Sequence, residues 1–261
     1  QTIIKMNNFE NSYRKILNNC LLNGIDRNDR TGVGSYSLFN QSIKINISKR
    51  FPIITGRKIY QKIFDTEFDW FINGETNIKR FKEAKVTIWD SWANKNGDLG
   101  PVYGYQMVNY NGNNINQLEA LITSLKVNKD GRRHIISLWN PIQLKEMALP
   151  PCYLYFQFFV DKNNKLNMFV LQRSGDLFLG IPYDIALFSR ILLYVSLKTD
   201  LKPNKIEVQI IDAHIYKNQI NSIKEYLSSP SFNLPKYNYK NENLTLLNYN
   251  CGPKITAKVA V

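Results

Sequence analysis

Residues Met147 to Asp184 read MALPPCYLYFQFFVDKNNKLNMFVLQRSGDLFLGIPYD and hold the clearest structural pattern in the chain. Two runs rich in aromatic and β-branched residues, Leu154–Val160 and Leu166–Gln172, flank the polar segment Asp161–Asn164. Such runs on either side of a short polar turn predict a β-hairpin. A β-sheet is therefore the expected scaffold for the residues at the two ends of this hairpin.

One cysteine stands just before the hairpin, in the sequence Pro150-Pro151-Cys152. After the second run we expect a charged turn over Gln172–Asp176, and then a helix that opens in the sequence Gly-Ile-Pro-Tyr-Asp. The returning strand can bring Arg173 back beside Cys152. Because a guanidinium stabilises the thiolate form that attacks electrophiles, the first hypothesis is a cysteine nucleophile with a cationic neighbour.

Length and composition favour a single domain. The chain has 261 residues, 44% of them hydrophobic, enough to bury one large core or two small ones. It contains no linker rich in Pro, Gly or Ser, no repeat and no low-complexity segment. We therefore expect one catalytic domain over residues 1–261.

The net charge of +13 comes from 34 basic and 21 acidic residues. The lysines are scattered and often alternate with asparagine, as in Asn94-Lys95-Asn96, whereas a basic arm that binds nucleic acid is blocky. We interpret the charge as a solvated Lys/Asn surface and do not expect nucleic acid as a partner. An anionic small ligand is compatible with this surface.

The cysteines Cys20, Cys152 and Cys251 are odd in number and far apart, and the chain has only two histidines. This set fits neither a disulfide framework nor a zinc site, so we expect a reducing compartment and no metal. The most apolar run, Ile185–Leu197, is interrupted by Arg190 and is too short to span a bilayer. These features predict a soluble, cytoplasmic protein.

Hydrophobic spacing predicts further elements. We expect helices over Phe9–Leu22, Lys58–Asn73 and Asn113–Val127, a strand pair within Ser35–Ile47, and strands over His134–Trp139 and Ile206–Ile211. Glu67 lies among the apolar residues of the second helix, where an unpaired buried charge would be costly. It is either a functional carboxylate or a partly exposed residue at the edge of the apolar stripe.

The sequences ALPPC, QRSGD and LGIPYDIA resemble the thymidylate synthase family. Further matches follow in that family's order, at Asn28–Gly32, Thr87–Asp90, Gly100–Gly104, Arg132–Arg133 and Asp212–Tyr216. The resemblance runs from about Phe9 to Val261. It implies an α/β fold with a large mixed sheet flanked by helices, and a homodimer packed sheet to sheet.

The resemblance also implies roles for single residues. Cys152 would be the nucleophile that adds to the pyrimidine, Glu67 would order water and relay protons, and Tyr103 would abut the base. The nucleotide would be bound by Arg30, Gln172, Arg173, Ser174, Asp184, His214 and Tyr216, together with Arg132 and Arg133 acting in trans from the partner of a homodimer. The co-substrate 5,10-methylenetetrahydrofolate would contact Ile88, Trp89, Asp176, Gly180, Tyr183 and Ala260. Within these sets, the arginines and Ser174 would hold the phosphate, and His214 and Tyr216 would bind the 3′-hydroxyl of the deoxyribose.

Three positions depart from the family pattern. Asp69 stands where the family usually has an apolar residue, Asp184 stands where it places an asparagine, and Tyr153 stands where it usually has a histidine. Uracil presents a donor at N3 and an acceptor at O4, which an amide complements, whereas cytosine presents the reverse. A protonated Asp184 would complement cytosine, and so would an ionised Asp184 facing a cytosine protonated at N3. The leading hypothesis is therefore 5-methylation or 5-hydroxymethylation of dCMP.

Three alternatives stay open at this point. Asp184 could simply be the N-cap of a helix that starts at Ile185, a favoured role for Asp. The chain could be an ordinary thymidylate synthase that uses dUMP. More distantly, the net charge would suit a nucleic-acid-binding regulator with a degenerate site.

Overall fold

The computed structural model describes residues 8–260, which form two compact units. The first unit comprises Gln1–Ile59, Gln172–Ser189 and Asn204–Val261, and the second comprises Tyr60–Leu171 and Arg190–Pro203. The prediction of a single domain over residues 1–261 stays a prediction.

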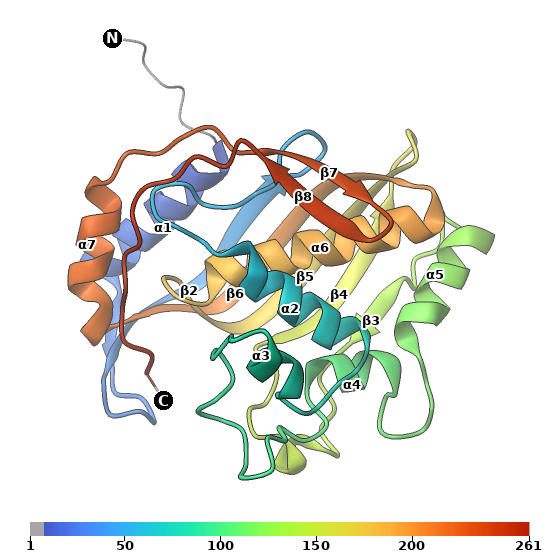
Figure 1. Ribbon diagram of the computed structural model, residues 1–261, viewed down its shortest axis with the longest axis horizontal. Coiled ribbons are helices and arrows are strands. Elements are labelled where there is room, and N and C mark those ends of the chain that lie inside the picture. The colour runs from blue at the N-terminus through green and yellow to red at the C-terminus, as the bar shows by residue number, and fades with distance from the viewer. Residues whose placement is uncertain (1–7, 261) are drawn as a thin grey trace. The chain divides into compact units, whose positions relative to one another are not determined.

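Helices and strands alternate irregularly along the chain (Figure 1). The helices are α1 (Asn8–Asn23), α2 (Gln61–Ile72), α3 (Lys79–Glu83), α4 (Tyr103–Val108), α5 (Gln117–Val127), α6 (Ile181–Thr199) and α7 (Ile220–Ser228), with 3-10 helices η1 (Leu144–Glu146) and η2 (Lys217–Gln219). The strands are β1 (Ile25–Arg27), β2 (Ser35–Asn46), β3 (Ile135–Ser137), β4 (Tyr153–Val160), β5 (Lys165–Asp176), β6 (Lys202–Tyr216), β7 (Lys236–Lys240) and β8 (Asn243–Leu247).

Six of these strands form one sheet in the order β1-β2-β6-β5-β4-β3. Strands β7 and β8 pair separately as an antiparallel hairpin. With helices flanking the six-stranded sheet, the expected α/β class is confirmed. The expected packing of this sheet against the sheet of a second copy stays a prediction.

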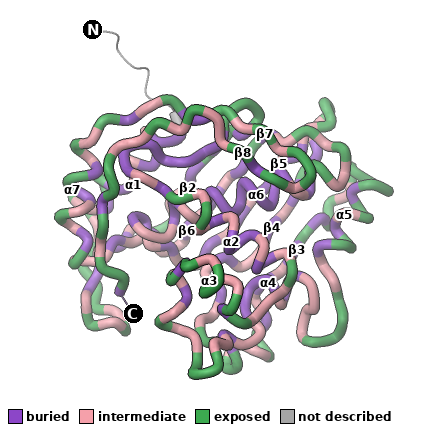
Figure 2. The backbone as a smooth tube through the Cα atoms, viewed as in Figure 1, coloured by how far each residue is buried: buried purple, intermediate pink, exposed green. Residues whose placement is uncertain are grey.

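Helix α1 buries its apolar stripe in the core of the first unit. Phe9, Tyr13, Leu17 and Cys20 are all buried, at the three- and four-residue spacing that predicted the helix (Figure 2). The hydroxyl of Tyr13 donates a hydrogen bond of 2.6 Å to the carbonyl of Leu177. Cys20 is therefore a core residue.

Strand β2 pairs with β6 in one continuous antiparallel register, so the strand pair predicted within Ser35–Ile47 is wrong. Asn40, within this strand, has a left-handed φ of 55°. Asparagine tolerates this conformation, and the ladder keeps the same register on both sides of it. One long strand therefore replaces the expected pair.

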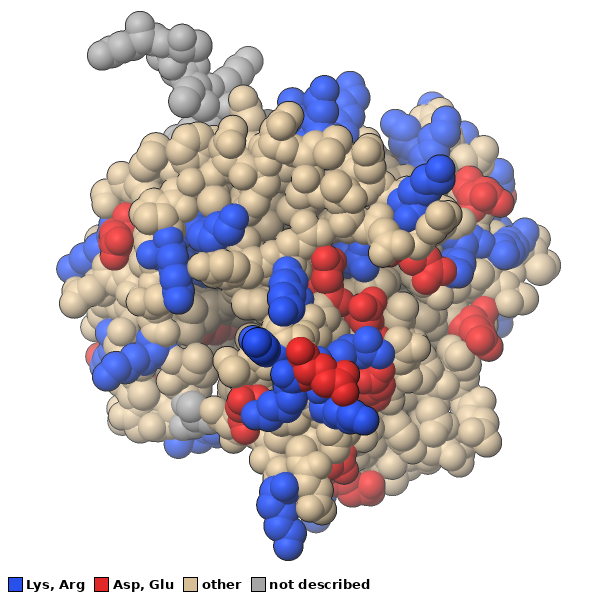
Figure 3. Space-filling model, in the orientation of Figure 1, with Lys and Arg blue, Asp and Glu red and all other residues tan. Residues whose placement is uncertain are grey.

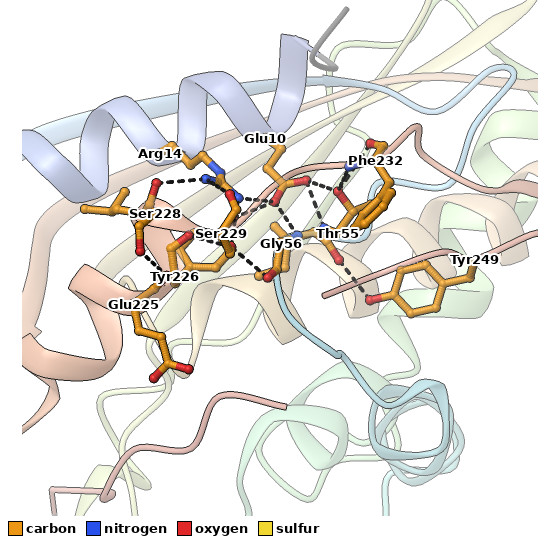
Figure 4. A network of polar contacts seen from close by, with 12 residues as sticks. Glu10, Arg14, Thr55, Gly56, Glu225, Tyr226, Ser228, Ser229, Phe232 and Tyr249 are labelled. Atoms are coloured by element: carbon orange, nitrogen blue, oxygen red, sulfur yellow. Dashed lines mark hydrogen bonds and ion pairs between the residues drawn. The ribbon is translucent and has the colours of Figure 1, made fainter. Parts of the chain in front are cut away.

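A buried carboxylate ties α1 to the segment that precedes α2 (Figure 4). Glu10 accepts hydrogen bonds from the backbone N–H groups of Thr55 (2.9 Å) and Gly56 (2.8 Å) and from the hydroxyl of Tyr226 (2.7 Å). Arg14, one helical turn further along, lies 3.4 Å from the same carboxylate. Burying this charge is tolerated because several donors surround it.

The same segment explains why α2 begins at Gln61 rather than at the predicted Lys58. The backbone N–H of Lys58 donates to the carbonyl of Pro253 (3.0 Å), and that of Ile59 donates to the hydroxyl of Tyr249 (3.1 Å). Tyr60, the N-cap of α2, has an extended backbone (φ −96°, ψ 111°), so the helix starts after it, and the long-range bonds hold Lys58 and Ile59 in a non-helical segment.

Helix α5 also begins later than predicted, at Gln117 rather than Asn113. Asn114 has a φ of 57°, which a helix does not allow. The side chain of Asn116 accepts a hydrogen bond from the N–H of Glu119 (3.0 Å) and so caps the helix two residues further on.

The predicted hairpin of β4 and β5 is confirmed. The N–H of Asp161 donates to the carbonyl of Lys165 (2.9 Å), and Asn164 supplies the left-handed turn residue with a φ of 55°. The charged turn predicted over Gln172–Asp176 is wrong, because β5 continues through it to Asp176. Gln172 and Gly175 are buried in this part of the strand, so these polar and small residues occupy strand positions that pack against the rest of the protein.

Two other strands differ in length from the predictions. Strand β3 covers only Ile135–Ser137, since the N–H groups of Leu138 and Trp139 both turn to the carbonyl of Leu154. Strand β6 continues past Ile211 to Tyr216, because β2 offers a partner for every residue of this extension.

An ion pair lies inside the second unit. Arg190 in α6 is only 4% exposed, and its Nε lies 3.2 Å from Oδ1 of Asp65 in α2. The Arg190 guanidinium also packs 4.3 Å from the ring centroid of Phe68. Burial raises the pKa of Asp65, and the charge of Arg190 opposes that shift. The apolar helix α6 therefore holds a cation because α2 supplies the counter-charge.

We expect Arg190→Met to lower the free energy of unfolding by about 2 kcal/mol, because Asp65, whose side chain is only 31% exposed, would lose its cationic partner. The double variant Asp65→Leu/Arg190→Met should return to within about 1 kcal/mol of the parent, since both charges are then gone. Urea unfolding followed by circular dichroism measures all three proteins. An equal loss in the single and double variants would contradict the pairing.

Across residues 8–260, no helix combines the length and the apolar character needed to cross a membrane. On the face shown in Figure 3, lysine and arginine side chains are spread among acidic and uncharged residues.

Candidate active site

Tyr103 stands at the tight start of α4 in the second unit. Its φ of 25° lies in the left-handed region, which is rare for a residue of this size. Neighbouring glycines make the turn possible: a Cβ on Gly100 would lie 2.1 Å from the carbonyl oxygen of Glu146, and one on Gly104 would lie 2.3 Å from that of Phe71. Backbone strain that surrounding structure holds in place is typical of functional sites.

The predicted nucleophile lies next to this strained tyrosine. The backbone N–H of Cys152 donates a hydrogen bond of 3.0 Å to the hydroxyl of Tyr103. The ring of Tyr153 packs 4.7 Å from the ring of Tyr103, measured between centroids. The Cys152 side chain is half-buried, so it is held in place and yet partly accessible.

Glu67 is buried in α2, with 7% of its surface exposed. The indole Nε1–H of Trp89 donates a hydrogen bond of 3.2 Å to Oε1 of Glu67, and the ring centroids of Trp89 and Tyr103 lie 5.7 Å apart. The alternative of a partly exposed glutamate at the stripe edge is therefore wrong. The second unit links Glu67, Trp89, Tyr103 and Cys152 in one chain of contacts.

The remaining candidates of the second unit lie nearer the surface. Ile88 is half-buried beside Trp89, and both Arg132 and Arg133 are exposed just before β3. A turn closed by the N–H of Gly131 on the carbonyl of Asn128 (3.1 Å) precedes the two arginines. Both side chains are thus free of the core of their own unit.

In the first unit, Asp184 lies in the first turn of α6. Its backbone N–H donates to the carbonyl of Gly180 (3.0 Å), as a residue inside a helix does. The N-cap role considered for Asp184 is therefore wrong, since the helix begins at Ile181 rather than at Ile185. Pro182 is tolerated in the first turn because its missing N–H would have no partner there.

The carboxyl of Asp184 is enclosed by protein but keeps some accessible surface. Burial raises its pKa to about 7, the hydrogen bond from Gln172 opposes the shift, and the charge of Asp176 adds to it. Gln172 donates that bond from Nε2 to Oδ2 at 2.9 Å. The buried Oε1 of Gln172 has no hydrogen-bond partner in the described part of the chain.

Asp176 organises the turn between β5 and α6. Its Oδ1 accepts from the N–H groups of Phe178 (2.9 Å) and Leu179 (3.0 Å), and its Oδ2 accepts from Nε2 of Gln219 at 2.8 Å. Gly180 follows, and its N–H donates to the carbonyl of Asp176 (3.1 Å). This carboxylate is thus held firmly in one orientation.

His214 and Tyr216 lie two residues apart on one face of β6, with ring centroids 5.1 Å apart. Nδ1 of His214 lies 3.3 Å from the backbone oxygen of Asp212 and 3.5 Å from its Oδ1. These contacts leave the opposite ring nitrogen, Nε2, to face other groups.

The other candidates of the first unit are spread over three segments. Arg30 is exposed in a loop shaped by Asp29, which accepts hydrogen bonds from the N–H (2.7 Å) and hydroxyl of Thr31. Arg173 and Ser174 are half-buried in β5, Tyr183 is half-buried in α6, and Ala260 is buried near the C-terminus. Cys152 and Arg173 belong to different units, so their approach to one another stays a prediction.

Among the described residues, no three His, Cys, Asp or Glu side chains gather in a way that could hold a metal ion. The side chains that gather in the two units are instead a thiol, carboxyl groups, a histidine and aromatic rings.

In the second unit, a strained tyrosine lies beside a cysteine, and a buried glutamate accepts a hydrogen bond from an indole, an arrangement typical of enzyme active sites. Residues 11–261 match the family described as Thymidylate synthase, and the chain belongs to that family. It is therefore a one-carbon transferase that acts at carbon 5 of a pyrimidine nucleotide, with methylenetetrahydrofolate as co-substrate.

Reasoning from the sequence missed two residues that shape the turn around Asp176. Gln219 orients Asp176 from 43 positions further along the chain, and Arg57 donates a hydrogen bond of 2.6 Å to the carbonyl of Phe178 in the same turn. Neither residue stands in a motif with a local partner, so no sequence signal pointed to them.

Proposed function

We propose that this enzyme modifies dCMP, adding a methyl or hydroxymethyl group at carbon 5 of the cytosine. The observation that carries this proposal is Asp184, whose pKa is raised to about 7 by burial. A carboxyl group with this pKa can share a proton with cytosine N3 near neutral pH, either as O–H facing N3 or as a carboxylate facing protonated N3.

The hydrogen bond from Gln172 supports cytosine over uracil. Because Nε2 of Gln172 donates to Oδ2 of Asp184, Oδ2 acts as an acceptor, and the proton of the neutral carboxyl belongs on Oδ1. With Oδ1 facing N3, Oδ2 would accept from the amino group at carbon 4. Uracil would place its O4 oxygen against Oδ2, and two acceptors would then meet in an enclosed site.

The reaction begins with the formation of a bond between the Cys152 sulfur and carbon 6 of the base, which makes carbon 5 nucleophilic. Carbon 5 would then bond to the one-carbon unit of methylenetetrahydrofolate, and the bond between that unit and the folate nitrogen would break, releasing tetrahydrofolate. Glu67 and Tyr103 would help remove the proton of carbon 5 through ordered water, and the Cys152–carbon 6 bond would break at the end. Hydride from the released tetrahydrofolate would complete a methyl group and leave dihydrofolate, whereas addition of water would complete a hydroxymethyl group.

The remaining candidate residues fit binding roles. Arg30, Arg173 and Ser174 would hold the phosphate, with charge-assisted bonds from the arginines. Asp176, which three N–H donors hold in place, would contact the pterin ring with its carboxylate, and Trp89 would line the folate pocket. A buried Trp89 excludes water from its surroundings, which slightly favours methylation.

We further propose that the active form is a homodimer in which Arg132 and Arg133 bind the phosphate of the partner's nucleotide. Both are exposed, as this role needs. The second unit also presents apolar side chains on one sheet face. The ring centroids of Tyr155 and Phe169 lie 6.1 Å apart, and Phe159, on the same face of β4 as Tyr155, is 66% exposed. A second sheet would cover such a surface.

The decisive assay uses dCMP and dUMP labelled with tritium at carbon 5, in the presence of methylenetetrahydrofolate, while absorbance of dihydrofolate is followed. We expect tritium release from dCMP, with dihydrofolate formed if the product is methylated and none if it is hydroxymethylated. Release from dUMP alone would overturn the dCMP proposal and make the chain an ordinary thymidylate synthase.

A further inference from the structure

Asp212 is a polar residue of β6 with no role in the reaction described so far. It lies on the same face of β6 as His214 and Tyr216, and its Oδ1 lies 3.5 Å from Nδ1 of His214. Its Oδ2 lies 3.6 Å from the guanidinium of Arg27 on β1. Asp212 thus stands between a histidine and an arginine.

The pairing of the sheet brings these groups together. Ser37 on β2 is directly opposite His214, and the buried Ser37 side chain interacts with Asp212. The side chain of Asp212 remains 37% exposed, whereas that of His214 is only 12% exposed. The histidine is therefore the enclosed member of the pair, and the aspartate connects it to the sheet edge.

The charges around His214 are mostly negative. Burial lowers the pKa of His214, but its interaction with Asp212 and the charge of Asp176 outweigh burial, so the pKa is raised. The same interaction with His214 lowers the pKa of Asp212. Asp29, in the loop after β1, also has a lowered pKa, chiefly through Thr31 and with a contribution from His214.

We propose that Asp212 is a positioning residue that holds His214 as a charged donor facing the 3′-hydroxyl group of the deoxyribose. With Nδ1–H directed at the backbone oxygen of Asp212 (3.3 Å), and the negatively charged Oδ1 of Asp212 at 3.5 Å, a protonated ring would present Nε2–H as a donor in a fixed direction. A neutral histidine with the proton on Nδ1 would instead present an acceptor at Nε2. The inference rests on the proposed function and on the expected binding of the 3′-hydroxyl by His214, and it assigns a role to Asp212 within them.

The first test needs no substrate. The chain has two histidines, so ring-labelled protein gives two assignable sets of ring signals by NMR. We expect the titration midpoint of His214 to fall in Asp212→Asn, while the substitution leaves the ring signals of buried His134, which contacts Ser124 at 3.3 Å, in place. An unchanged His214 midpoint would overturn the proposal.

Arg27 offers a matched variant of opposite sign. Arg27→Met removes a cation from the far side of Asp212, so the midpoint of His214 should rise rather than fall. If both substitutions only loosened the sheet edge, the titration midpoint of His214 would move in the same direction in the two variants. That outcome would contradict the pairing of Asp212 with His214.

The second test compares two nucleotides in steady-state kinetics. For Asp212→Asn we expect the KM for dCMP to rise about tenfold with little change in kcat, because one charge-assisted hydrogen bond to the sugar is weakened. The analogue 2′,3′-dideoxy-CMP lacks the 3′-hydroxyl, so its KM should not respond to the substitution. An equal rise for both nucleotides would overturn the link to the 3′-hydroxyl.

Failure of the proposed function gives a different result from failure of this inference. If neither nucleotide is turned over, calorimetric binding of dCMP and its dideoxy analogue replaces the kinetics, and the NMR titration still tests the pairing itself. Asp212→Glu is the conservative variant. Because it keeps the negative charge, the titration midpoint of His214 should stay near that of the parent instead of falling as in Asp212→Asn.

Discussion

Replacing Cys152 by serine is expected to lower the rate of tritium release from carbon 5 of dCMP by at least about ten-thousand-fold. The serine hydroxyl is a far weaker nucleophile than a thiolate at neutral pH, so the bond to carbon 6 would not form. The backbone N–H that donates to Tyr103 is unchanged by the substitution, so the loop should keep its conformation. Calorimetry should show that dCMP still binds.

Cys251→Ser is the matched control for this variant. Cys251 is half-buried and close to Tyr249, whose hydroxyl donates to the carbonyl of Ile54. Serine can replace the thiol in that position, and activity should stay within about twofold of the parent. Comparable losses in the Cys152 and Cys251 variants would contradict the assignment of Cys152 as the nucleophile.

The Cys152 variant also tests the proposed dimer. Co-expression of Cys152→Ser with Arg132→Ala/Arg133→Ala, each chain with its own affinity tag, allows the mixed dimers to be purified. If the arginines act in trans, one of the two sites in each mixed dimer has every residue, and about half of the parental activity should return. No recovery would mean that the arginines do not serve the partner's site.

Local patterns predicted most of the elements because the relevant forces act over a few residues. The hairpin from Leu154 to Gln172 and the stripe of α1 follow from side-chain periodicity, and both are confirmed. The predicted element boundaries were wrong where backbone groups bind residues that are far away in the sequence. Lys58 and Ile59 look helical, but they donate to Pro253 and Tyr249, about 190 residues away, which no local pattern reveals.

The residues of the candidate site likewise fall into those that local motifs predict and those that only the fold brings together. Cys152 and Tyr103 were named from motifs, and the structure places them in hydrogen-bond contact. The ion pair between Asp65 and Arg190 was not predicted, because each charge looks misplaced until the two helices are brought together. Asp184 was read as either a cap or a base-reading residue, and only the start of α6 at Ile181 removes the first alternative.

Replacing Asp184 by asparagine is expected to reverse the substrate preference. The ratio of kcat/KM for dCMP over that for dUMP should fall by up to about ten-thousand-fold, since mispaired polar groups in an enclosed site discriminate at that level. An amide can place its oxygen toward N3 and its NH2 toward O4 of uracil. Gln172 can turn its own amide to match, because its Oε1 has no other partner among residues 8–260.

The pH dependence of kcat/KM for dCMP provides a second test of Asp184→Asn. With a pKa raised to about 7, Asp184 is mostly protonated below that pH, so kcat/KM of the parent for dCMP should be full there and decline as the pH rises through about 7. The asparagine variant has no such group and should lose this decline. An unchanged pH profile, or unchanged turnover of dUMP, would contradict base reading by Asp184.

The same raised pKa affects stability, which can be measured without any substrate. The folded state keeps the Asp184 proton up to about pH 7, whereas an unfolded aspartate loses it near its ordinary pKa of about 4. Neutral Asp184 thus contributes stability that is fully present below about pH 4 and is lost as the pH rises toward 7. Urea unfolding of the parent and of Asp184→Asn across this range should show the parent losing stability relative to the variant. Parallel curves would mean that the carboxyl is ionised in the free enzyme, and cytosine would then have to carry the shared proton.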